Sequence, residues 1–377
     1  MSNDDNQIRL FEVPLDGVAT HSDWASSPSL RPALWIKEGE TIYDMEWYPG
    51  MNSGEPSTCC FLSTSRDNPV HVWDAFTGHL RAAYCAYTDA EELDAAYSIC
   101  FDRLTPSNKL YCGFNNCIRI YDVERPGRQH AVLKTFKRAH GQSTGQRGIV
   151  SCAAINPDKS GLLAAGTYSR NIGLYDTLSG KLLYNLQGHR GGVTQVNWGP
   201  EGCYLYSGAR KDDEILCWDV RGSGDALFRL PRAVRTNQRV QFSVDQSGSR
   251  LITPSQEDGT SGASDCDCEG GGSGVEGGRA GGVHSGARGQ LRIFDLCTGS
   301  FLTSASLPTG ALCGVQLHPF HQVIAAIAGQ RNFDLPAGPA GPAEEDPSAP
   351  LGLANPQEAG WADPEAHQDP ALFLASL

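Results

Sequence analysis

The sequence predicts an all-β chain built from repeated four-stranded units. Five strand-like runs end in an aromatic residue followed by Asp, with Asp-to-Asp steps of 48, 54, 43 and 76 residues. The last step contains a Gly-rich insertion of 33 residues (257–289), and its removal leaves 43. A period of about 40–45 residues with a Trp-Asp ending is typical of a WD-repeat β-propeller. The five runs are HVWD (71–74), IRIYD (118–122), IGLYD (172–176), ILCWD (215–219) and LRIFD (291–295).

Composition agrees with this fold class. The chain of 377 residues has 43 Gly and 22 Pro but only 3 Met, which disfavours long regular helices. Each period also has the internal order of one blade, with four short strands separated by turn residues. In the period at 188–228 the expected strands are 193–198, 204–207, 215–218 and 226–230.

The repeats give five complete blades and a partial blade at each end of the chain. Residues 6–13 and 33–36 resemble a third and a fourth strand, whereas 312–317 and 323–328 resemble a first and a second. The two halves either pair and close a six-bladed ring or belong to two blades of a seven-bladed ring. The segment ALFLASL (371–377) is a candidate for a missing strand. The complete blades are expected at about 42–87, 95–137, 148–187, 191–230 and 239–305.

The Trp-Asp pattern has a structural explanation. A His before the first strand, a Ser on the second, an Asp in the next turn and a Trp on the third can hydrogen-bond in a row, which satisfies buried polar groups. His189, Ser207, Asp212 and Trp218 fit this row, and Asp67 has the same offset before Trp73. The other blades carry Asn115 and Ser169 at the Asp position. The structural residues predicted in this way are Asp67, Trp73, Asp74, His189, Ser207, Asp212, Trp218 and Asp219.

Two segments lack the composition of a packed domain. Residues 257–289 contain 12 Gly, and residues 335–377 contain 8 Pro, 10 Ala and seven acidic residues without Lys or Arg. Neither segment has enough apolar surface to offset its ordering entropy. The sequence therefore predicts a propeller over 1–333, a disordered insertion within one blade at 257–289, and a disordered tail at 335–377.

Charge and cysteine usage bear on partners and compartment. The net charge is −13, but residues 61–256 carry 23 basic and 18 acidic residues, a basic centre between acidic flanks. The 13 Cys are an odd number with no CxxC pair, which indicates a reducing compartment. No apolar run reaches membrane-spanning length, and the polar N-terminus does not resemble a signal peptide.

No enzyme chemistry is indicated. The sequence contains no phosphate-binding loop, no His-Glu-x-x-His and no Cys/His tetrad. Gly141–Gly145 formally matches Gly-x-Ser-x-Gly, but a basic loop precedes Ser143 where a strand is needed. We therefore expect no catalytic residue, no metal, no cofactor and no small-molecule substrate.

The basic residues fall mainly in loops of one face. Strands alternate in direction, so loops between blades and turns between second and third strands share that face. A basic face suits a phosphate backbone, and sequence-specific RNA reading adds amide edges and stacking surfaces. The alternative is a solvated face or a contact for an acidic protein. The candidates for RNA binding are Arg66, Asn68, His71, Lys137, Arg138, Arg147, Arg170, Arg190, Arg210, Lys211, Asn237, Gln238 and Arg239.

Four stretches are far more specific than Trp-Asp dipeptides. They are DNPVHVWDAFTGHLRAAY (67–84), GIVSC (148–152), SGARKDDEILCWDVR (207–221) and TNQRVQF (236–242), with TIYDMEWYPG (41–50) upstream. In sequence and spacing, residues 6–333 resemble the telomerase Cajal body protein 1 family. The segments 257–289 and 335–377 have no counterpart in that family.

The resemblance implies a nuclear, non-enzymatic, seven-bladed propeller. Family members bind small Cajal body RNAs of the H/ACA class through their Cajal-body box, direct them and, in animals, telomerase RNA to Cajal bodies, and so support telomere maintenance. The implied partners are dyskerin-type ribonucleoprotein proteins and the cytosolic chaperonin, with some of the protein in the cytoplasm. The alternative function is a nuclear WD-repeat scaffold that contacts proteins only.

Overall fold

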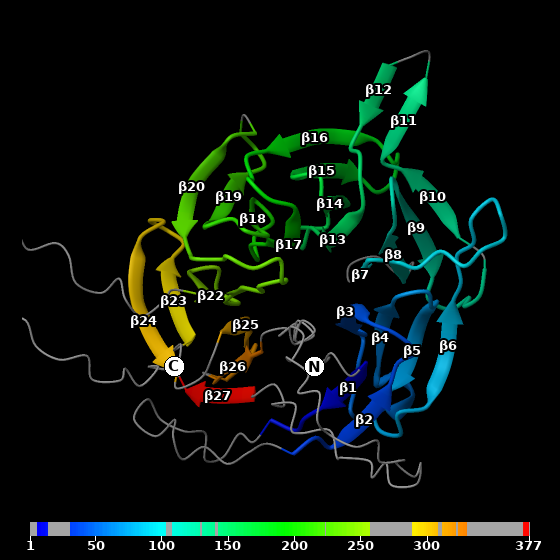
Figure 1. The fold of residues 1–377 in the computed structure, drawn as a ribbon, viewed down its shortest axis with the longest axis horizontal. Coiled ribbons are helices and arrows are strands. Elements are labelled where there is room, and N and C mark those ends of the chain that lie inside the picture. Colours follow the sequence, from blue (N-terminus) through cyan, green and yellow to red (C-terminus); the bar gives the residue numbers. More distant parts are fainter. Residues whose placement is uncertain are drawn as a thin grey trace, which may run out of the picture.

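The structure is a computed structural model that describes residues 6–13, 31–102, 108–128, 130–139, 142–222, 224–256, 289–307, 311–321, 323–329 and 372–376. Its sheets are arranged in a ring around a central channel, with the innermost strands beside the channel (Figure 1). The predicted WD-repeat β-propeller is confirmed. No helix in these ranges is long and apolar enough to cross a membrane.

Five four-stranded antiparallel sheets form the complete blades, as the repeat period predicts. The first consists of β3 (Ile42–Trp47), β4 (Cys60–Ser65), β5 (Val70–Asp74) and β6 (Leu80–Tyr84), with a 3-10 turn at Pro56–Thr58. The second consists of β7 (Ser98–Phe101), β8 (Lys109–Gly113), β9 (Cys117–Asp122) and β10 (Ala131–Lys134). The third consists of β13 (Val150–Ile155), β14 (Leu162–Thr167), β15 (Asn171–Asp176) and β16 (Leu182–Gln187). The fourth consists of β17 (Val193–Trp198), β18 (Tyr204–Ala209), β19 (Glu214–Asp219) and β20 (Ala226–Pro231). The fifth consists of β21 (Ser243–Val244), β22 (Arg250–Ser255), β23 (Gly289–Asp295) and β24 (Phe301–Leu307).

The two ends of the chain form separate sheets. β1 (Gln7–Leu10) pairs with β2 (Leu34–Lys37), and β25 (Leu312–Leu317) pairs with β26 (Val323–Ala328). β27 (Leu372–Ser376) pairs with β26, so the segment ALFLASL does supply a strand. The described strands show no pairing between β1–β2 and β25–β27, so the six-bladed closure by pairing of the two halves is wrong for this structure.

β27 and Gly289 adjust two predicted boundaries. β27 lies within the predicted tail 335–377, where an apolar run in an otherwise polar segment favours strand pairing. Gly289, the last residue of the predicted insertion, already pairs with Leu307 in the β23–β24 ladder. The rest of both segments, including Cys266 and Cys268, lies outside the described residues.

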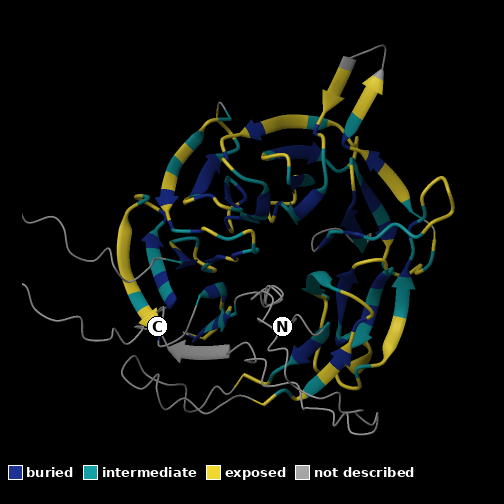
Figure 2. Cartoon of the chain, in the orientation of Figure 1, coloured by how far each residue is buried: buried dark blue, intermediate teal, exposed yellow. Residues whose placement is uncertain are grey.

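The core lies between neighbouring blades. The middle strands are mostly buried, whereas the outermost strands β6, β10, β16, β20 and β24 keep exposed positions (Figure 2). β1–β2 packs on the first blade through Ile8, Ile36 and Phe61. β25 and β26 pack on the fifth blade through a cluster that includes Ile252 and Leu312. Each blade therefore buries its faces on its neighbours.

Side chains also join neighbouring innermost strands. Asp44 and Glu46 on β3 accept hydrogen bonds from the backbone of β7, at Ile99 and Phe101. Ser98 on β7 donates to the Val150 carbonyl, and Ser151 on β13 donates to the Val193 carbonyl. Gln195 on β17 exchanges two hydrogen bonds with the Phe242 backbone next to β21. These bonds hold the innermost strands in consecutive order around the channel.

One element does not follow the blade repeat. The loop between the second and third blades forms a hairpin, β11 (Phe136–Ala139) paired with β12 (Gln142–Gly145). In Figure 1 it projects outward from the ring. The sequence analysis predicts a plain inter-blade loop there.

Candidate nucleic-acid interface at the channel mouth

The upper face is defined here as the face on which the innermost strands begin, and polar rows support its turns. His189 bonds Asp212 through Nδ1 at 2.8 Å and Ser207 through Nε2 at 2.7 Å, and Trp218 Nε1 donates to Ser207 Oγ at 2.7 Å. All four side chains are buried. The Asp212 carboxylate also accepts the Arg190 backbone N–H at 3.0 Å. This row therefore ties the inter-blade loop to the β18–β19 turn.

The first blade forms a different row from the one predicted. The Glu38 carboxylate, which is buried, accepts hydrogen bonds from Ser63 and Ser65 and lies 3.1 Å from His71 Nδ1. Trp73 Nε1 donates to Ser63 Oγ at 2.7 Å. Asp67 is exposed and pairs with Arg66, so its assignment to the row is wrong. Glu38 stands before the first strand, where the fourth blade has His189, and a second carboxylate beside it would be repelled.

Cationic side chains project from the turns between second and third strands. Arg66 lies in the β4–β5 turn, Arg170 in the β14–β15 turn, and Lys211 in the β18–β19 turn, all exposed. Arg170 has φ of 71° and Lys211 has φ of 45°, in the left-handed region that residues other than glycine rarely adopt. Strain of this kind persists where the surroundings fix it and clusters at functional sites.

Arg210 and Tyr168 form a layer between two blades. The Arg210 guanidinium carbon lies 3.7 Å from the centroid of the Tyr168 ring, a cation–π contact. Gly191 and Gly192 make room for it, since a Cβ on Gly191 would lie 1.7 Å from the Arg210 carbonyl oxygen and one on Gly192 would lie 2.9 Å from the Tyr168 backbone. Burial raises the pKa of Tyr168, opposed by the charge of Arg210.

A second aromatic pair lies at the start of the first two blades. The rings of Tyr43 on β3 and Tyr97 before β7 are stacked, 5.2 Å apart with 27° between their planes. Both side chains are half-buried. Burial raises the pKa of Tyr43, with further contributions from Tyr97 and Tyr168. The three tyrosines therefore share the mouth of the channel.

The structure reassigns Arg239 from base reading to the framework. Its guanidinium bonds the Thr194 carbonyl at 2.9 Å, the Tyr43 carbonyl at 3.3 Å and the Asp44 carboxylate at 2.9 Å. Thr194 lies on the fourth blade and Asp44 on the first, so the side chain extends across the channel. Its donors are engaged, which makes the prediction that Arg239 reads a base wrong for this structure.

The remaining candidates on this face differ in availability. Arg147 and Arg190 are exposed beside the starts of β13 and β17, and Asn237 is exposed before β21. Gln238 is half-buried with an unpartnered buried Oε1. Asn68 donates to the Arg66 carbonyl at 2.8 Å, and His71 is occupied by Glu38.

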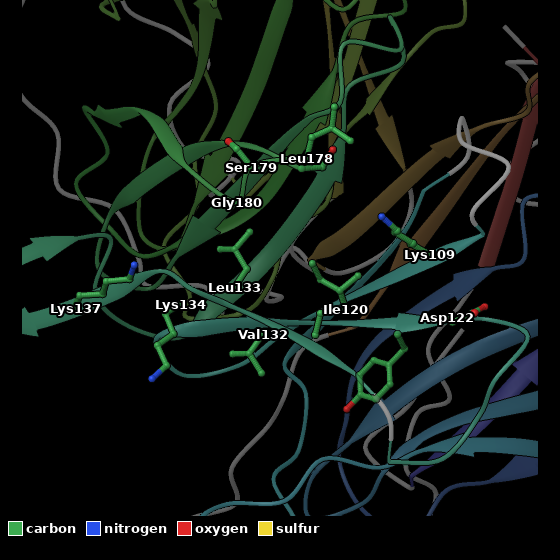
Figure 3. Close-up of a pocket in the computed structure, with 13 residues that line it drawn as sticks. Lys109, Ile120, Asp122, Val132, Leu133, Lys134, Lys137, Leu178, Ser179 and Gly180 are labelled. Carbon is green, nitrogen blue, oxygen red and sulfur yellow. The ribbon is translucent and has the colours of Figure 1, made fainter.

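Lys137 and Arg138 do not lie with these residues. Both are exposed on β11 of the projecting hairpin, so their placement on the upper face is wrong. Lys137 instead lines a groove of about 740 Å³ between the second and third blades. Figure 3 shows Lys109, Lys134 and Lys137 around this groove, with Val132 and Leu178 beside them.

The described residues contain no group of three or more His, Cys, Asp or Glu side chains that could hold a metal ion. Ser143, in the formal Gly-x-Ser-x-Gly match, lies on β12 opposite Arg138. A nucleophile elbow needs a helix after the serine, whereas this serine lies within a hairpin strand.

Sequence reasoning does not identify Glu38, Tyr43, Tyr97 or Asp44. The signal available for Tyr43 and Asp44 is their place at the start of the first innermost strand, in TIYDMEW. Glu38 and Tyr97 stand before innermost strands, at the position that holds His189 in the fourth blade. Inspection of that position in every blade is the rule that finds them.

Comparison with known proteins places the chain among WD-repeat proteins. Residues 180–219 match the family described as WD domain, G-beta repeat. Telomerase Cajal body protein 1 of Mesocricetus auratus is 37% identical over 357 residues, covering 92% of this chain and 59% of that protein. The protein of the same name in Homo sapiens is 44% identical over 259 residues, covering 69% of this chain and 45% of that protein. The Drosophila melanogaster homolog is 35% identical over 267 residues, covering 66% and 47%. The chain therefore spans about half to three-fifths of the length of these relatives.

Proposed function

The chain belongs to the telomerase Cajal body protein 1 family, and from that premise we propose that it is an RNA-binding scaffold. Its upper face recognises the Cajal-body box of H/ACA-type small Cajal body RNAs, and telomerase RNA where that RNA carries the box. The protein directs these ribonucleoproteins to nuclear Cajal bodies and supports telomere maintenance. It performs no catalytic step.

One observation carries the proposal: exposed cations surround a mouth that contains aromatic rings. Arg66, Arg147, Arg170, Arg190 and Lys211 come from separate loops of one face. Such side chains neutralise phosphates and release counterions, which provides affinity without requiring a particular sequence. Aromatic rings at the same place provide stacking surfaces for unpaired bases.

The proposed partners follow the same reasoning. Dyskerin-type proteins would be present because they assemble on the same RNA. The cytosolic chaperonin would assist folding, because the ring depends on contacts between distant residues, such as Arg239 with Asp44, and such contacts form slowly. A fraction of the protein would therefore be cytoplasmic before import.

The first test is crosslinking and sequencing of the RNA bound to the tagged protein in its own cells. We expect enrichment of H/ACA-type small RNAs, with crosslinks in their terminal loops. Background RNA together with stable protein partners would overturn the proposal.

Charge reversal tests the face itself. Arg210→Glu with Lys211→Glu, and separately Arg170→Glu with Lys211→Glu, should weaken RNA binding without unfolding the ring. The slope of log affinity against log salt should become shallower by about 1 to 1.5 for two lost phosphate contacts. Lys137→Glu with Arg138→Glu makes the same charge change on the outer hairpin and should leave the RNA affinity unchanged. Equal losses in the hairpin variant would show that the upper face is not the RNA site.

The groove in Figure 3 favours the alternative, a protein-only scaffold. Three lysines around exposed Val132 and Leu178 complement an acidic peptide that carries apolar side chains. This function predicts that partners remain bound after nuclease treatment. It also predicts that Lys134→Glu with Lys137→Glu releases them, while the upper-face variants do not.

A further inference from the structure

The channel mouth carries aromatic surface that the fold does not use completely. Tyr43 and Tyr97 come from different blades, stack on each other and stay half-buried. Stacking in a protein core normally buries both rings, whereas these two keep part of their surface at the upper face. A planar ligand can therefore extend the stack without any movement of the strands.

Cations stand beside these rings. Arg210 covers the Tyr168 ring at 3.7 Å, and Arg66 is near enough to Tyr43 for its charge to lower that phenol's pKa against burial. Arg66 is exposed and reaches solvent from the β4–β5 turn. The mouth thus combines aromatic faces with positive charge at their edges.

The channel is closed below the tyrosines. Arg239 extends from the fifth blade to Asp44 on the first, and its guanidinium also holds the Tyr43 carbonyl. The ion pair neutralises the Asp44 carboxylate, so the floor of the mouth does not repel a phosphate. It also limits the depth to which a ligand can enter, which suits one flat ring better than a threaded chain.

We propose that the channel mouth holds an unpaired RNA base stacked on the Tyr43–Tyr97 pair, with Arg66 and Arg210 beside the adjoining phosphates. This inference rests on the proposed RNA-binding function and specifies its ligand as single-stranded RNA. Proteins that bind single strands combine a basic groove with aromatic platforms, because every base has a flat face. A duplex conceals those faces, and an acidic peptide would engage the cations but leave the tyrosine rings without a planar partner.

The test compares two RNA probes with the full chain. One is a hairpin whose single-stranded loop carries 2-aminopurine, and the other is a fully paired duplex of matching length. We expect wild-type protein to prefer the hairpin and to quench 2-aminopurine fluorescence. Tyr43→Leu should weaken hairpin binding about tenfold or more and abolish the quench. Tyr43→Phe, which keeps the flat ring, should preserve both.

Control variants separate this inference from the proposed function. Arg170→Glu with Lys211→Glu should weaken binding of both probes while the quench at saturation remains. Tyr97→Leu is the second variant, in case Tyr43→Leu lowers the unfolding temperature. Unchanged hairpin affinity and quench in both leucine variants would overturn the stacking site. If the charge variants still weaken binding, the proposed function stands; if they do not, both fail.

A peptide is the remaining outcome. If a polyglutamate peptide binds wild-type protein, loses affinity in the leucine variants and displaces the hairpin, the mouth is a peptide site. That result would overturn the assignment to RNA bases.

Discussion

The Arg239 guanidinium and the Asp44 carboxylate lie 2.9 Å apart, although 195 residues separate them in the sequence. Arg239 precedes the innermost strand of the fifth blade, and Asp44 lies on that of the first. In the ring, the two blades are separated by the terminal sheets on one side and by three complete blades on the other (Figure 1). The ion pair therefore links blades that have no shared sheet edge.

This pair gives the first prediction. Arg239→Gln leaves Asp44 partly buried without its cation, and Asp44→Asn leaves Arg239 without its anion, so each should lower the free energy of unfolding. In a double-mutant cycle we expect a coupling energy of about 1–2 kcal/mol, measured by urea unfolding. If the double variant loses the sum of the two single losses, the contact does not stabilise the ring.

Glu38 gives a pH dependence. Burial raises the pKa of its carboxyl, but hydrogen bonds from His71 and Ser63 and the charge of His71 outweigh burial and hold the pKa below its usual 4.5. The folded protein therefore binds this proton more weakly than the unfolded chain does. The resulting stabilisation is complete above about pH 4.5 and is lost as the pH falls through the lowered value.

We expect Glu38→Gln to remove this part of the acid sensitivity and to cost about 1–2 kcal/mol at neutral pH. The measurement is the unfolding temperature as a function of pH. Asp67→Asn is the matched control, because Asp67 has the sequence offset of a row residue but is exposed. An equal response in both variants would show that Glu38 has no special role.

The left-handed turns predict a trade between stability and binding. Lys211→Gly relieves the strain of a residue with φ of 45°, so it should stabilise the fold by up to about 1 kcal/mol. It also removes a cation from the upper face and should weaken RNA binding several-fold. Lys159→Gly, at φ of 64° in the β13–β14 turn on the opposite face, should stabilise similarly without changing RNA affinity. Unfolding temperature and fluorescence anisotropy of bound RNA test both variants, and a loss of affinity in Lys159→Gly would count against the face assignment.

The sequence predicts the five complete blades well because their signal is local and repeated. Each blade restates the same order of strands and turns within about 43 residues, so the Trp-Asp endings at Trp73 and Trp218 mark the third strands. The row around His189 follows from the same repeat. At the ends of the chain the repeat is incomplete, and the pairing of β27 with β26 depends on a strand that is remote in sequence.

Features that depend on distant residues leave no local signal. Arg239 looks like any loop arginine until the fold brings Asp44 to it. Glu38 replaces a histidine and so falls outside the expected pattern. Lys137 and Arg138 look like inter-blade residues, but Phe136 pairs with Gly145 and turns the loop into a hairpin that carries them outward. Residue type predicts the chemistry of such positions, whereas backbone pairing decides where they lie.

The last prediction concerns Gly191, whose missing side chain permits the layer of Arg210 on Tyr168. A Cβ at this position would lie 1.7 Å from the Arg210 carbonyl oxygen, so the β18–β19 turn would have to move. We expect Gly191→Ala to lower the unfolding temperature and to weaken hairpin RNA binding, because both Arg210 and Lys211 shift with the turn. Gly222→Ala is the control, since a Cβ there meets only the Asp219 carbonyl oxygen at 3.5 Å, an ordinary contact. Wild-type RNA affinity in Gly191→Ala would show that the position of the β18–β19 turn does not matter for binding, and the upper-face assignment would then rest on the β4–β5 and β14–β15 turns alone.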